Sequence, residues 1–352
     1  MDFLYKSFVR RLFFQFEPEM AHCIAVALLK WIDNSYIFKN AIRLLFQNES
    51  GPINIFGLSF PNKIGLAAGF DKDGHFPSTA SALGFGHVEV GTVTPRPQEG
   101  NPKPRLFRLS KEESLVNKMG FNNEGAESMR KRIKKFYPKG ERHSPLGINI
   151  GKAKETPLEE SIKDYTESFN ALAEIADYFT LNISSPNTEN LRKLQHEDNL
   201  RPLLQDIDRV NSNWAKKNKT TKIPCLIKIS PDESFSRLEK LIETVLESNI
   251  DGIIATNTTS KRPNCIGKNL DGGLSGKSME ALSLETIKFI SKLTYGKLPI
   301  IGVGGVHNTE SLNRKLDSGA CMVQLYTAFI YEGPFLASKL AKSLKNHNSW
   351  LT

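Results

Sequence analysis

The sequence predicts an α/β protein: a (β/α)8 TIM barrel preceded by a small N-terminal amphipathic helical subdomain. Eight short apolar runs alternate with helix-like patterns after residue 63, and that count, in about 290 residues, is typical of this barrel. Polar residues and glycines gather just after nearly every run. The first 47 residues differ, because their apolar residues recur at helical spacing. A doubly wound open sheet is the structural alternative.

The first of the two expected domains, residues 1–50, reads as two or three amphipathic helices. Apolar residues recur at helical spacing from Leu4 to Phe16, from Met20 to Trp31 and from Phe38 to Phe46, and Pro18 suits the first turn of the second helix. Aromatic residues flanked by basic ones suit a subdomain that lies in a membrane interface. A helical cap packed on the main domain explains the same pattern, so both interpretations stay open.

The second expected domain, residues 51–352, begins with a turn-rich stretch at 51–62 that predicts a small hairpin. The expected strands that follow are Ile64–Phe70, Val88–Val93, Leu146–Ile150, Tyr178–Ile183, Cys225–Ile229, Gly252–Thr256, Ile300–Val303 and Met322–Tyr326. The helical patterns between them include Leu158–Ala176, Phe235–Glu247, Leu282–Leu293 and Thr309–Asp317.

Composition narrows the function classes. The 352 residues are 39% hydrophobic and 24% charged, which is globular. The net charge of +9 invites a nucleic-acid or anionic-membrane partner, but Lys and Arg are spread along the chain, so we expect no nucleic-acid binding. The four cysteines are far apart without a CxxC pair, which argues against disulfides or a metal site. No apolar run approaches the roughly 18 residues of a membrane span.

Residues at the ends of the expected strands suggest a flat, phosphorylated ligand. Small residues before Lys72 let such a ligand approach the backbone, and Lys72 offers a cation. Lys228 stands inside an apolar strand, where a lysine is costly to bury unless it meets an anion. Glycines at 272–276 and 302–305 precede Tyr326-Thr327, near the usual phosphate site of this barrel. FMN fits better than a dinucleotide, because no GxGxxG opens a helix.

The stretch 182–188 (NISSPNT) follows the fourth run and carries most of the candidate chemistry. Pro186 fixes its own φ and keeps Ser185 out of the α region. An ordinary Asx/Ser turn explains the heptapeptide alone equally well. Asn117, Asn182, Asn187 and Asn257 carry amides that donate and accept, as an imide-containing ring requires. Asn117 could instead cap the helix that follows it. No Ser-His-Asp order or paired carboxylates stand out, which argues against hydrolysis.

Seven motifs in order, AAGFDK, GTVTPRPQ, PRLFRL, NKMGFNN, NISSPNT, GGLSG and IGVGG, span residues 67–305. With the N-terminal helices they make the chain resemble the membrane-associated, quinone-dependent (class 2) dihydroorotate dehydrogenases. The resemblance implies a flavoenzyme of pyrimidine biosynthesis that oxidises (S)-dihydroorotate to orotate. Soluble members typically have Cys where this chain has Ser185 and lack the N-terminal helices, so both features point to class 2.

The resemblance implies site residues position by position. The expected FMN contacts are Ala68, Gly69, Phe70, Asp71, Lys72, Thr92, Asn149, Asn182, Lys228, Thr256, Gly276, Gly305, Tyr326 and Thr327. The expected substrate contacts are Lys72, Asn117, Lys118, Met119, Gly120, Phe121, Asn182, Asn187, Asn257 and Thr258. In the quinone tunnel that the N-terminal helices would form, the expected polar residues are His22 and Arg108.

The implied mechanism removes a proton from C5 of the substrate with Ser185 as base and passes a hydride from C6 to flavin N5. A serine hydroxyl is a poor base alone, so Ser185 needs a relay, for which Thr188 or a bound water is the candidate. One departure lies in the closing loop. The family commonly has a glycine shortly after NT, where this chain reads Glu189-Asn190, and Asn tolerates left-handed backbone geometry better than most residues.

The expected partners are dihydroorotate and orotate, a membrane quinone, and a membrane surface contacted by the N-terminal helices. We expect a peripheral protein on the cytoplasmic face of a bacterial inner membrane, because the short start before the first helix shows no Arg/Ser-rich transit segment. The alternatives are another FMN barrel that reduces a pyrimidine, and a non-enzymatic membrane- or RNA-binding barrel protein.

Overall fold

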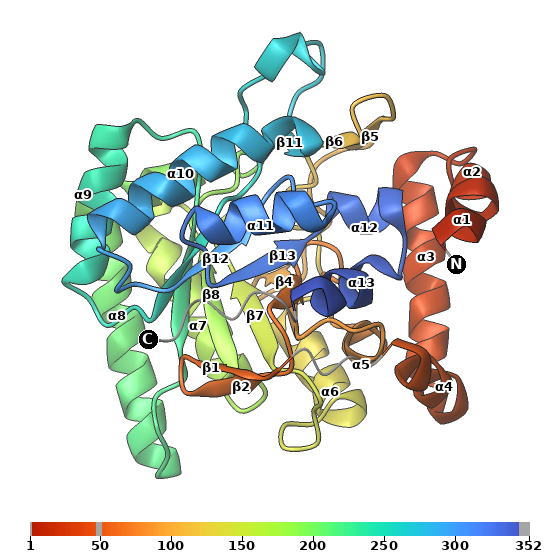
Figure 1. The fold of residues 1–352 in the computed structure, drawn as a ribbon. Coiled ribbons are helices and arrows are strands. Elements are labelled where there is room, and N and C mark those ends of the chain that lie inside the picture. The colour runs from red at the N-terminus through yellow and green to blue at the C-terminus, as the bar shows by residue number, and fades with distance from the viewer. Residues whose placement is uncertain (1, 47–50, 345–352) are drawn as a thin grey trace.

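The computed structural model describes residues 2–46 and 51–344, and a closed barrel of eight parallel strands lies at its centre (Figure 1). Around the barrel the strands are β3 (Ile64–Leu66), β4 (His87–Val93), β7 (Leu146–Ile150), β8 (Tyr178–Asn182), β9 (Cys225–Ile229), β10 (Gly252–Ala255), β12 (Ile300–Val303) and β13 (Met322–Leu325). Each overlaps one expected run, and the (β/α)8 prediction is confirmed. The open-sheet alternative is wrong, because β13 pairs with β3 and closes the barrel.

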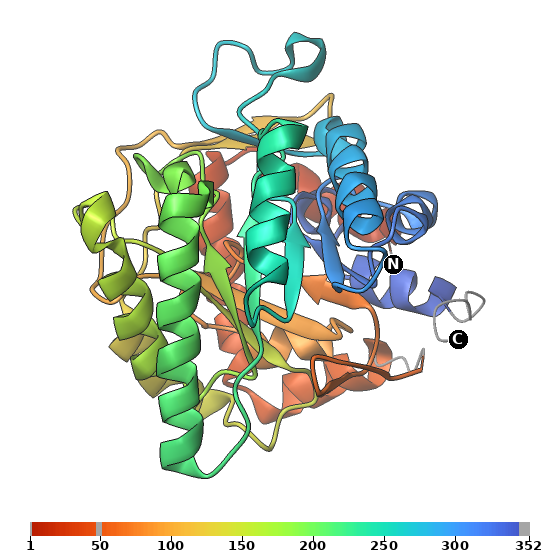
Figure 2. The same ribbon diagram turned by 90° about the vertical axis from the view of Figure 1, so that its left-hand side faces the viewer.

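Helices surround the barrel, and Figure 2 shows the long helix α8 upright on one side of it. They are α5 (Pro77–Ala82), α6 (Ala126–Phe136), α7 (Ser161–Leu172), α8 (Glu197–Asn218), α9 (Phe235–Leu246), α10 (Glu280–Leu293), α11 (Thr309–Asp317), α12 (Thr327–Glu332) and α13 (Leu336–Ser343). Short helical turns are η2 (Leu158–Glu160), η3 (Leu191–Gln195), η4 (Pro263–Cys265) and η5 (Lys277–Met279). The four expected helices are found, and α11 has the expected bounds.

Two small sheets close the barrel's ends. The expected hairpin forms from β1 (Ile53–Ile55) and β2 (Leu58–Phe60), and its apolar residues pack with Tyr178 and other buried residues in a second hydrophobic cluster. At the other end, β5 (Leu106–Leu109), β6 (Ser114–Asn117) and β11 (Gly273–Gly276) make an antiparallel sheet. The sequence interpretation treated residues 272–276 as a loop. It missed β11 because the partner strand β6 lies some 160 positions earlier, and local patterns do not reveal such pairing.

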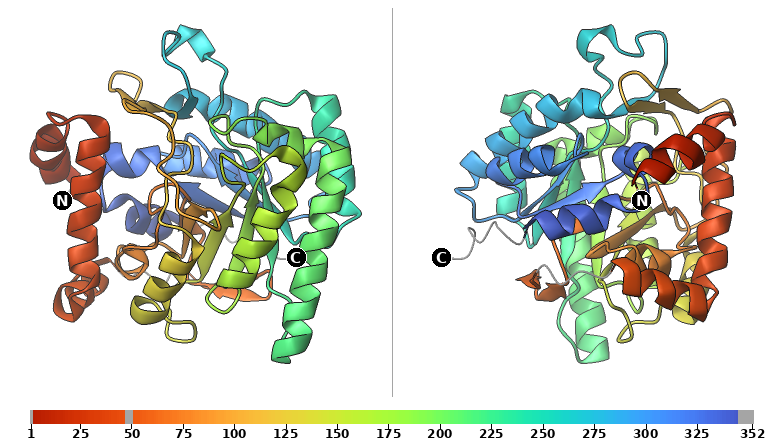
Figure 3. Two further views of the ribbon diagram at one scale, coloured as in Figure 1. Left: turned by 180° about the vertical axis from the view of Figure 1, so that it is seen from behind. Right: turned by 45° about the vertical axis from the view of Figure 1, so that its right-hand side comes forward.

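The N-terminal segment is helical, as expected: α1 (Asp2–Leu4), the π-helix η1 (Tyr5–Val9), α2 (Arg10–Phe13), α3 (Pro18–Asp33) and α4 (Tyr36–Phe46). Figure 3 (right) shows these helices beside α12 and α13. No single described helix is long and apolar enough to cross a membrane; the bent pair formed by residues 5–13 and 18–33 passes that test only jointly. Residues 47–50 lie outside the described part, and the domain boundary at residue 50 stays a prediction.

Two buried carboxylates on α3 attach the N-terminal helices to the barrel domain. Glu19 pairs with Arg105, whose Nη2 lies 2.7 Å from Glu19 Oε1 and whose Nε lies 3.1 Å from each carboxylate oxygen. Asp33 Oδ1 accepts the backbone N–H of Thr79 at 2.5 Å. Burial acts to raise the pKa of Glu19, but the hydrogen bonds and charge of Arg105 outweigh it and lower that pKa. The helices therefore pack as a cap, as one of the two interpretations expected.

Candidate active site

A cavity opens at the C-terminal ends of the barrel strands, with about 1150 Å³ of empty space including its mouth. It brings together most of the expected site residues, drawn from nearly every strand end. Those that line it are Ala68, Gly69, Lys72, Thr92, Asn117, Met119, Gly120, Phe121, Asn182, Ser185, Asn187, Lys228, Thr256, Asn257, Thr258, Gly276, Gly305, Tyr326 and Thr327.

Five of the expected FMN, substrate and catalytic residues do not line this cavity. Phe70 lines a second, apolar cavity. The Asp71 carboxylate accepts the backbone N–H groups of His75 and Phe76 at 2.8 and 2.9 Å, so it shapes the loop after β3. The remaining three do not line the first cavity either: Asn149 is fully buried, Lys118 bonds through its backbone, and Thr188 is buried in the loop after β8.

Three asparagines and a threonine form a continuous chain of hydrogen bonds below the cavity. Asn149 Oδ1 accepts from Thr92 Oγ1 at 2.5 Å and from Asn182 Nδ2 at 3.2 Å. Asn182 Nδ2 also donates to Thr92 Oγ1, and Asn182 Oδ1 accepts from Asn257 Nδ2 at 3.1 Å. Because each amide is held by its neighbour, the groups that face a ligand have fixed donor and acceptor sides.

The stretch 182–188 forms the loop that follows β8. Ser185 is buried, and its Oγ accepts the backbone N–H of Asn187 at 3.2 Å. Asn187 Nδ2 donates to Asn117 Oδ1 at 3.0 Å, so the two expected substrate amides are bonded to each other at the wall of the cavity. Among the described residues, Asn187 Oδ1 and Thr188 Oγ1 are buried without a hydrogen-bond partner. Of the two residues only Asn187 lines the cavity, so its unsatisfied acceptor marks where a ligand or water can bind.

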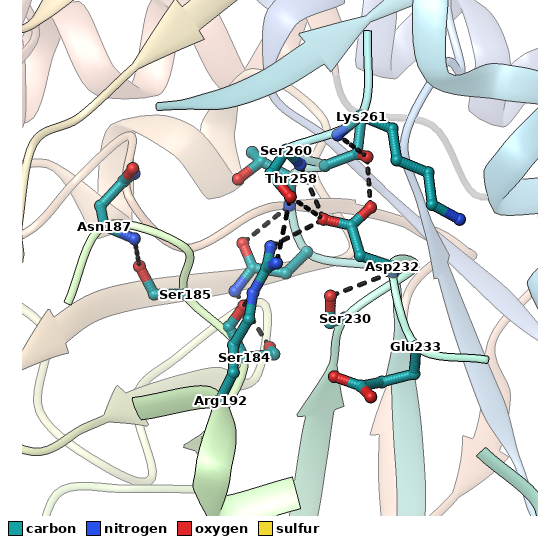
Figure 4. A network of polar contacts seen from close by, with 12 residues as sticks. Ser184, Ser185, Asn187, Arg192, Ser230, Asp232, Glu233, Thr258, Ser260 and Lys261 are labelled. Atoms are coloured by element: carbon teal, nitrogen blue, oxygen red, sulfur yellow. Dashed lines mark hydrogen bonds and ion pairs between the residues drawn. The ribbon is translucent and has the colours of Figure 1, made fainter. Parts of the chain in front are cut away.

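An ion pair fixes the outer end of this loop (Figure 4). Arg192 Nη2 lies 2.9 Å from Asp232, which also accepts the N–H and the hydroxyl of Ser260 at 2.7 Å each. Although burial acts to raise the pKa of Asp232, the hydrogen bonds from Thr259 and Ser260 hold it below its usual value. The loop is thus tied to the loops after β9 and β10. No sequence motif had pointed to Arg192 or Asp232.

The turn after Thr188 adopts left-handed geometry at Asn190, with φ 57°. A glycine commonly occupies this part of the loop in the family that the sequence resembles. Asn is among the few residues that tolerate this backbone region. The expectation that the turn survives without glycine is therefore confirmed.

Lys72 and Lys228 give the cavity a cationic character, whereas the third lysine of its lining, Lys277, is paired with Glu113. Burial lowers the pKa of Lys228, and the negative charge of Glu89 opposes that shift. Burial likewise lowers the pKa of Lys72, against the charges of Asp73 and Glu19. Buried cations of this kind are stabilised by anions, so the cavity suits a ligand with negative groups.

The far end of the cavity has the features of a phosphate site. Gly304 and Gly305 have φ values of 106° and 85°, and a Cβ on Gly305 would lie 2.6 Å from the Cα of Glu280. No other residue fits there without displacing α10. The hydroxyls of Thr327 and Ser275 lie 2.8 Å apart at the start of α12. Backbone N–H groups near glycines and a helix start are the usual cradle for phosphate.

The second cavity lies between the N-terminal helices and the barrel, with about 1450 Å³ of empty space. Its lining is mainly apolar, from residues such as Phe13, Ala25 and Leu29, and it meets the first cavity at Tyr326, which lines both. The expected polar residues His22 and Arg108 both line it. Burial and then the charge of Lys72 lower the pKa of His22 to about 3, so its ring is neutral near neutral pH.

The structure adds functional candidates that the sequence interpretation missed. Gln324 lines the first cavity, and Glu89 lies fully buried below it. Each is a polar residue inside an apolar strand, the same signal that had singled out Lys228. A cluster of Asp73, His75 and Glu124 has ligand atoms within 4.8 Å of one another. Glu124 is paired with Arg132 there, and nothing else points to a metal.

Comparison with known proteins gives a consistent result. Residues 52–347 match the family described as dihydroorotate dehydrogenase. The chain is 44% identical to the dihydroorotate dehydrogenase (quinone) of Christiangramia forsetii, over 97% of this chain and 98% of the relative. It is 42% identical to the dihydroorotate dehydrogenase (quinone) of Shewanella halifaxensis, over 97% of this chain and 99% of the relative. The structure of DHODH from Eimeria tenella in complex with ferulenol superposes with a TM-score of 0.85 at 35% identity, covering 93% of this chain and 90% of that one.

Proposed function

The chain belongs to the dihydroorotate dehydrogenase family, and we propose that it oxidises dihydroorotate to orotate in pyrimidine biosynthesis with a quinone as electron acceptor. One observation carries the proposal. A polar cavity lined by Lys72, Lys228, Ser185 and paired amides adjoins an apolar cavity at a single residue, Tyr326. The polar ring of dihydroorotate needs a polar cavity, and an apolar quinone needs an apolar cavity beside it.

The residues of the polar cavity fit FMN. Gly304 and Gly305 have positive φ values and let the backbone after β12 pass close to α10, and glycine-rich backbone at such a position can bind a phosphate. Thr256 Oγ1 and Gln324 Oε1 are buried and without partners among the described residues, and both residues line the cavity. Such groups need a ligand with donors, which the edge of a flavin ring system offers. Bound FMN would supply the hydride-accepting chemistry that these side chains lack.

The protein's own side chains would bind the substrate, orient it and take its proton. Asn117, Asn187 and Asn257 present amides to the substrate ring, and Lys72 offers a cation to its carboxylate. Ser185 would remove the C5 proton, since its buried Oγ faces the cavity in the loop held by the Arg192–Asp232 pair. Thr188 stays the candidate relay for that proton. Lys228 would stabilise negative charge that develops beside it.

The apolar cavity would admit the quinone, with His22 and Arg108 as its polar groups. Arg108 donates to the backbone oxygen of Phe16, and its guanidinium lies 4.6 Å from the ring centroid of Phe14, so it is held at the chamber's wall. We further propose that the exposed apolar face of the N-terminal helices lies in a membrane, from which the quinone would enter. The following large apolar side chains there are at least 58% exposed: Phe3, Leu4, Phe8, Trp31, Tyr36, Ile37, Leu44 and Leu45.

Anaerobic mixing of the purified protein with dihydroorotate tests the proposal directly. We expect a yellow protein whose flavin absorbance bleaches on mixing, and whose colour returns when a quinone is added. A protein that holds no flavin, or one whose flavin does not bleach with dihydroorotate, would overturn the proposed function. Bleaching that only oxygen and no quinone reverses would overturn the assignment of the apolar cavity.

A further inference from the structure

Glu89 is a fully buried carboxylate in the barrel interior, on the middle of β4. Its Oε1 accepts from Asn149 Nδ2 at 2.8 Å. Its Oε2 accepts from Gln324 Nε2 at 2.8 Å, Thr180 Oγ1 at 3.1 Å and Tyr178 Oη at 3.3 Å. Four groups from three strands thus donate to this one carboxylate, which acts only as an acceptor.

An ionised carboxylate only accepts hydrogen bonds, whereas an amide has a donor side and an acceptor side. Asn149 must therefore turn its NH2 group toward Glu89, which leaves its Oδ1 directed at Thr92 and Asn182. Gln324 is fixed in the same way. Its Nε2 is held by Glu89, so its unpartnered Oε1 is the group left for a ligand in the cavity that Gln324 lines.

The orientation passes along the chain of amides to the cavity. Asn182 must donate to the oxygen that Asn149 presents, so its own Oδ1 faces Asn257 Nδ2 at 3.1 Å. Asn257 Oδ1 in turn accepts the backbone N–H of Thr258 at 2.8 Å. Each amide has one orientation that satisfies both neighbours. The series has a fixed acceptor at one end, the Glu89 carboxylate, and a fixed donor at the other, the backbone N–H of Thr258.

We propose that Glu89 is a positioning residue that sets the hydrogen-bond polarity of the ligand site, through Asn149 to Asn182 and Asn257 on one side and through Gln324 on the other. Glu89 touches neither substrate nor cofactor in this role. Its charge also acts on Lys228. The role rests on the proposed function, because FMN and orotate are the ligands by which it is measured.

The test compares Glu89→Gln with Glu89→Asp in the flavin-loaded protein. Gln keeps the size of the side chain but can donate as well as accept, so Asn149 and Gln324 lose the neighbour that fixes their donor sides. Asp removes a methylene but still only accepts. We expect orotate affinity, followed by the change in flavin absorbance, to fall roughly ten- to a hundredfold in Glu89→Gln. The FMN dissociation constant, from the fluorescence of released flavin, should rise in the same variant. Glu89→Asp should lose less than Glu89→Gln in both.

Tyr178→Phe is the matched control, because it removes one donor to Glu89 and leaves the amide chain intact. Its affinities for both ligands should stay within about twofold of wild type. A purely structural role would give the reverse order, with Asp worse than the isosteric Gln. That order, or unchanged affinities in Glu89→Gln, would overturn the proposal. If Glu89→Gln does not fold, a Glu89→Asp protein that has lost orotate binding would overturn it, and one that has kept it would support it.

The control on the wild type separates the two proposals. Bleaching of its flavin by dihydroorotate tests the proposed function alone, whatever Glu89 does. If the wild type binds FMN and orotate but is not reduced, the function fails while the polarity test remains valid. If it is reduced normally while Glu89→Gln binds both ligands as tightly, only the role of Glu89 fails.

Discussion

The N-terminal helices and the barrel interior depart from the usual distribution of residues in opposite directions. On the helices, large apolar side chains such as Ile37 and Leu44 are 77% and 85% exposed. Inside the barrel, charged and amide side chains such as Glu89, Lys228 and Asn149 are 5% exposed or less. Soluble proteins generally bury the first kind and expose the second. We relate the first departure to the proposed membrane contact and the second to the proposed ligands.

The two departures differ in how the protein compensates for them. Inside the barrel, buried polar groups such as Glu89, Asn149 and Asn182 bond to one another, and Thr256 Oγ1 and Gln324 Oε1, which are left without partners, belong to residues that line the polar cavity. On the helices, nothing among the described residues covers the apolar face, which is the face that we propose lies in a membrane. The comparison therefore predicts that polar changes act on ligand chemistry, whereas apolar changes act on quinone entry and membrane binding.

The largest expected effect is on the chemistry of the polar cavity and leaves the apolar cavity unaffected. Ser185→Ala removes the proposed base, and general bases contribute about 10²- to 10⁴-fold to rate. Flavin reduction by dihydroorotate in a stopped-flow experiment should slow by that factor, while FMN stays bound and its reoxidation by quinone is unchanged. Normal reduction at neutral pH would contradict the role of Ser185.

The next largest effect is on stability, and it concerns the ion pair that joins the N-terminal helices to the barrel. Glu19→Gln leaves Arg105 buried without its counter-charge, and breaking such a pair costs about 3–5 kcal/mol. Urea unfolding should show that loss. The double variant Glu19→Leu/Arg105→Met should recover much of it, because an apolar pair leaves no buried charge. Equal stability of Glu19→Gln and wild type would show that the pair does not hold the helices.

Lys315 is a buried lysine outside the site, and its burial is expected to lower the stability of the protein. Lys315 on α11 is fully buried with its Nζ 2.8 Å from Ser283 Oγ, and burial lowers its pKa to about 7. Its unfolded pKa lies near 10.5, so between these values the unfolded chain binds more protons and the free energy of unfolding rises with pH. Lys315→Met should stabilise the protein at pH 7 by on the order of 2 kcal/mol and flatten that rise. Identical pH profiles would contradict this.

A smaller effect tests whether the apolar cavity acts independently of the polar cavity. Ala25→Trp on α3 places a large ring in the second cavity. Turnover with quinone should show a KM raised by about tenfold, while the rate of flavin reduction is unchanged. Cys23→Trp, on the same helix but exposed, is the control and should behave like wild type. A slower flavin reduction in Ala25→Trp would argue that the chambers are not separate.

The smallest effect tests the exposed apolar face. Ile37→Ser and Leu44→Ser should each weaken binding to phospholipid vesicles by about 1 kcal/mol, measured by co-sedimentation. Tyr295→Ser is the matched control, because Tyr295 is 86% exposed but lies on the barrel between α10 and β12. Loss of binding in the control as well would show that the membrane contact is not confined to the N-terminal helices.

Much of the fold could be predicted because its signals are local. The eight strand runs and the helix Thr309–Asp317 are each encoded in consecutive residues, so periodicity and turn residues locate them without the rest of the chain. Glycines and amides at the strand ends could be assigned to one site for the same reason, since a barrel places all those ends together.

The sequence by itself determined the barrel, the amphipathic helices and most of the side chains that line the polar cavity. Only the tertiary structure decided the pairing of β11 with β6, the Glu19–Arg105 and Arg192–Asp232 ion pairs, and the position of Glu89 below the asparagines. The physical reason is distance along the chain. These contacts join residues 40 to 160 positions apart, where hydrogen-bond direction and charge pairing depend on three-dimensional packing rather than on local pattern.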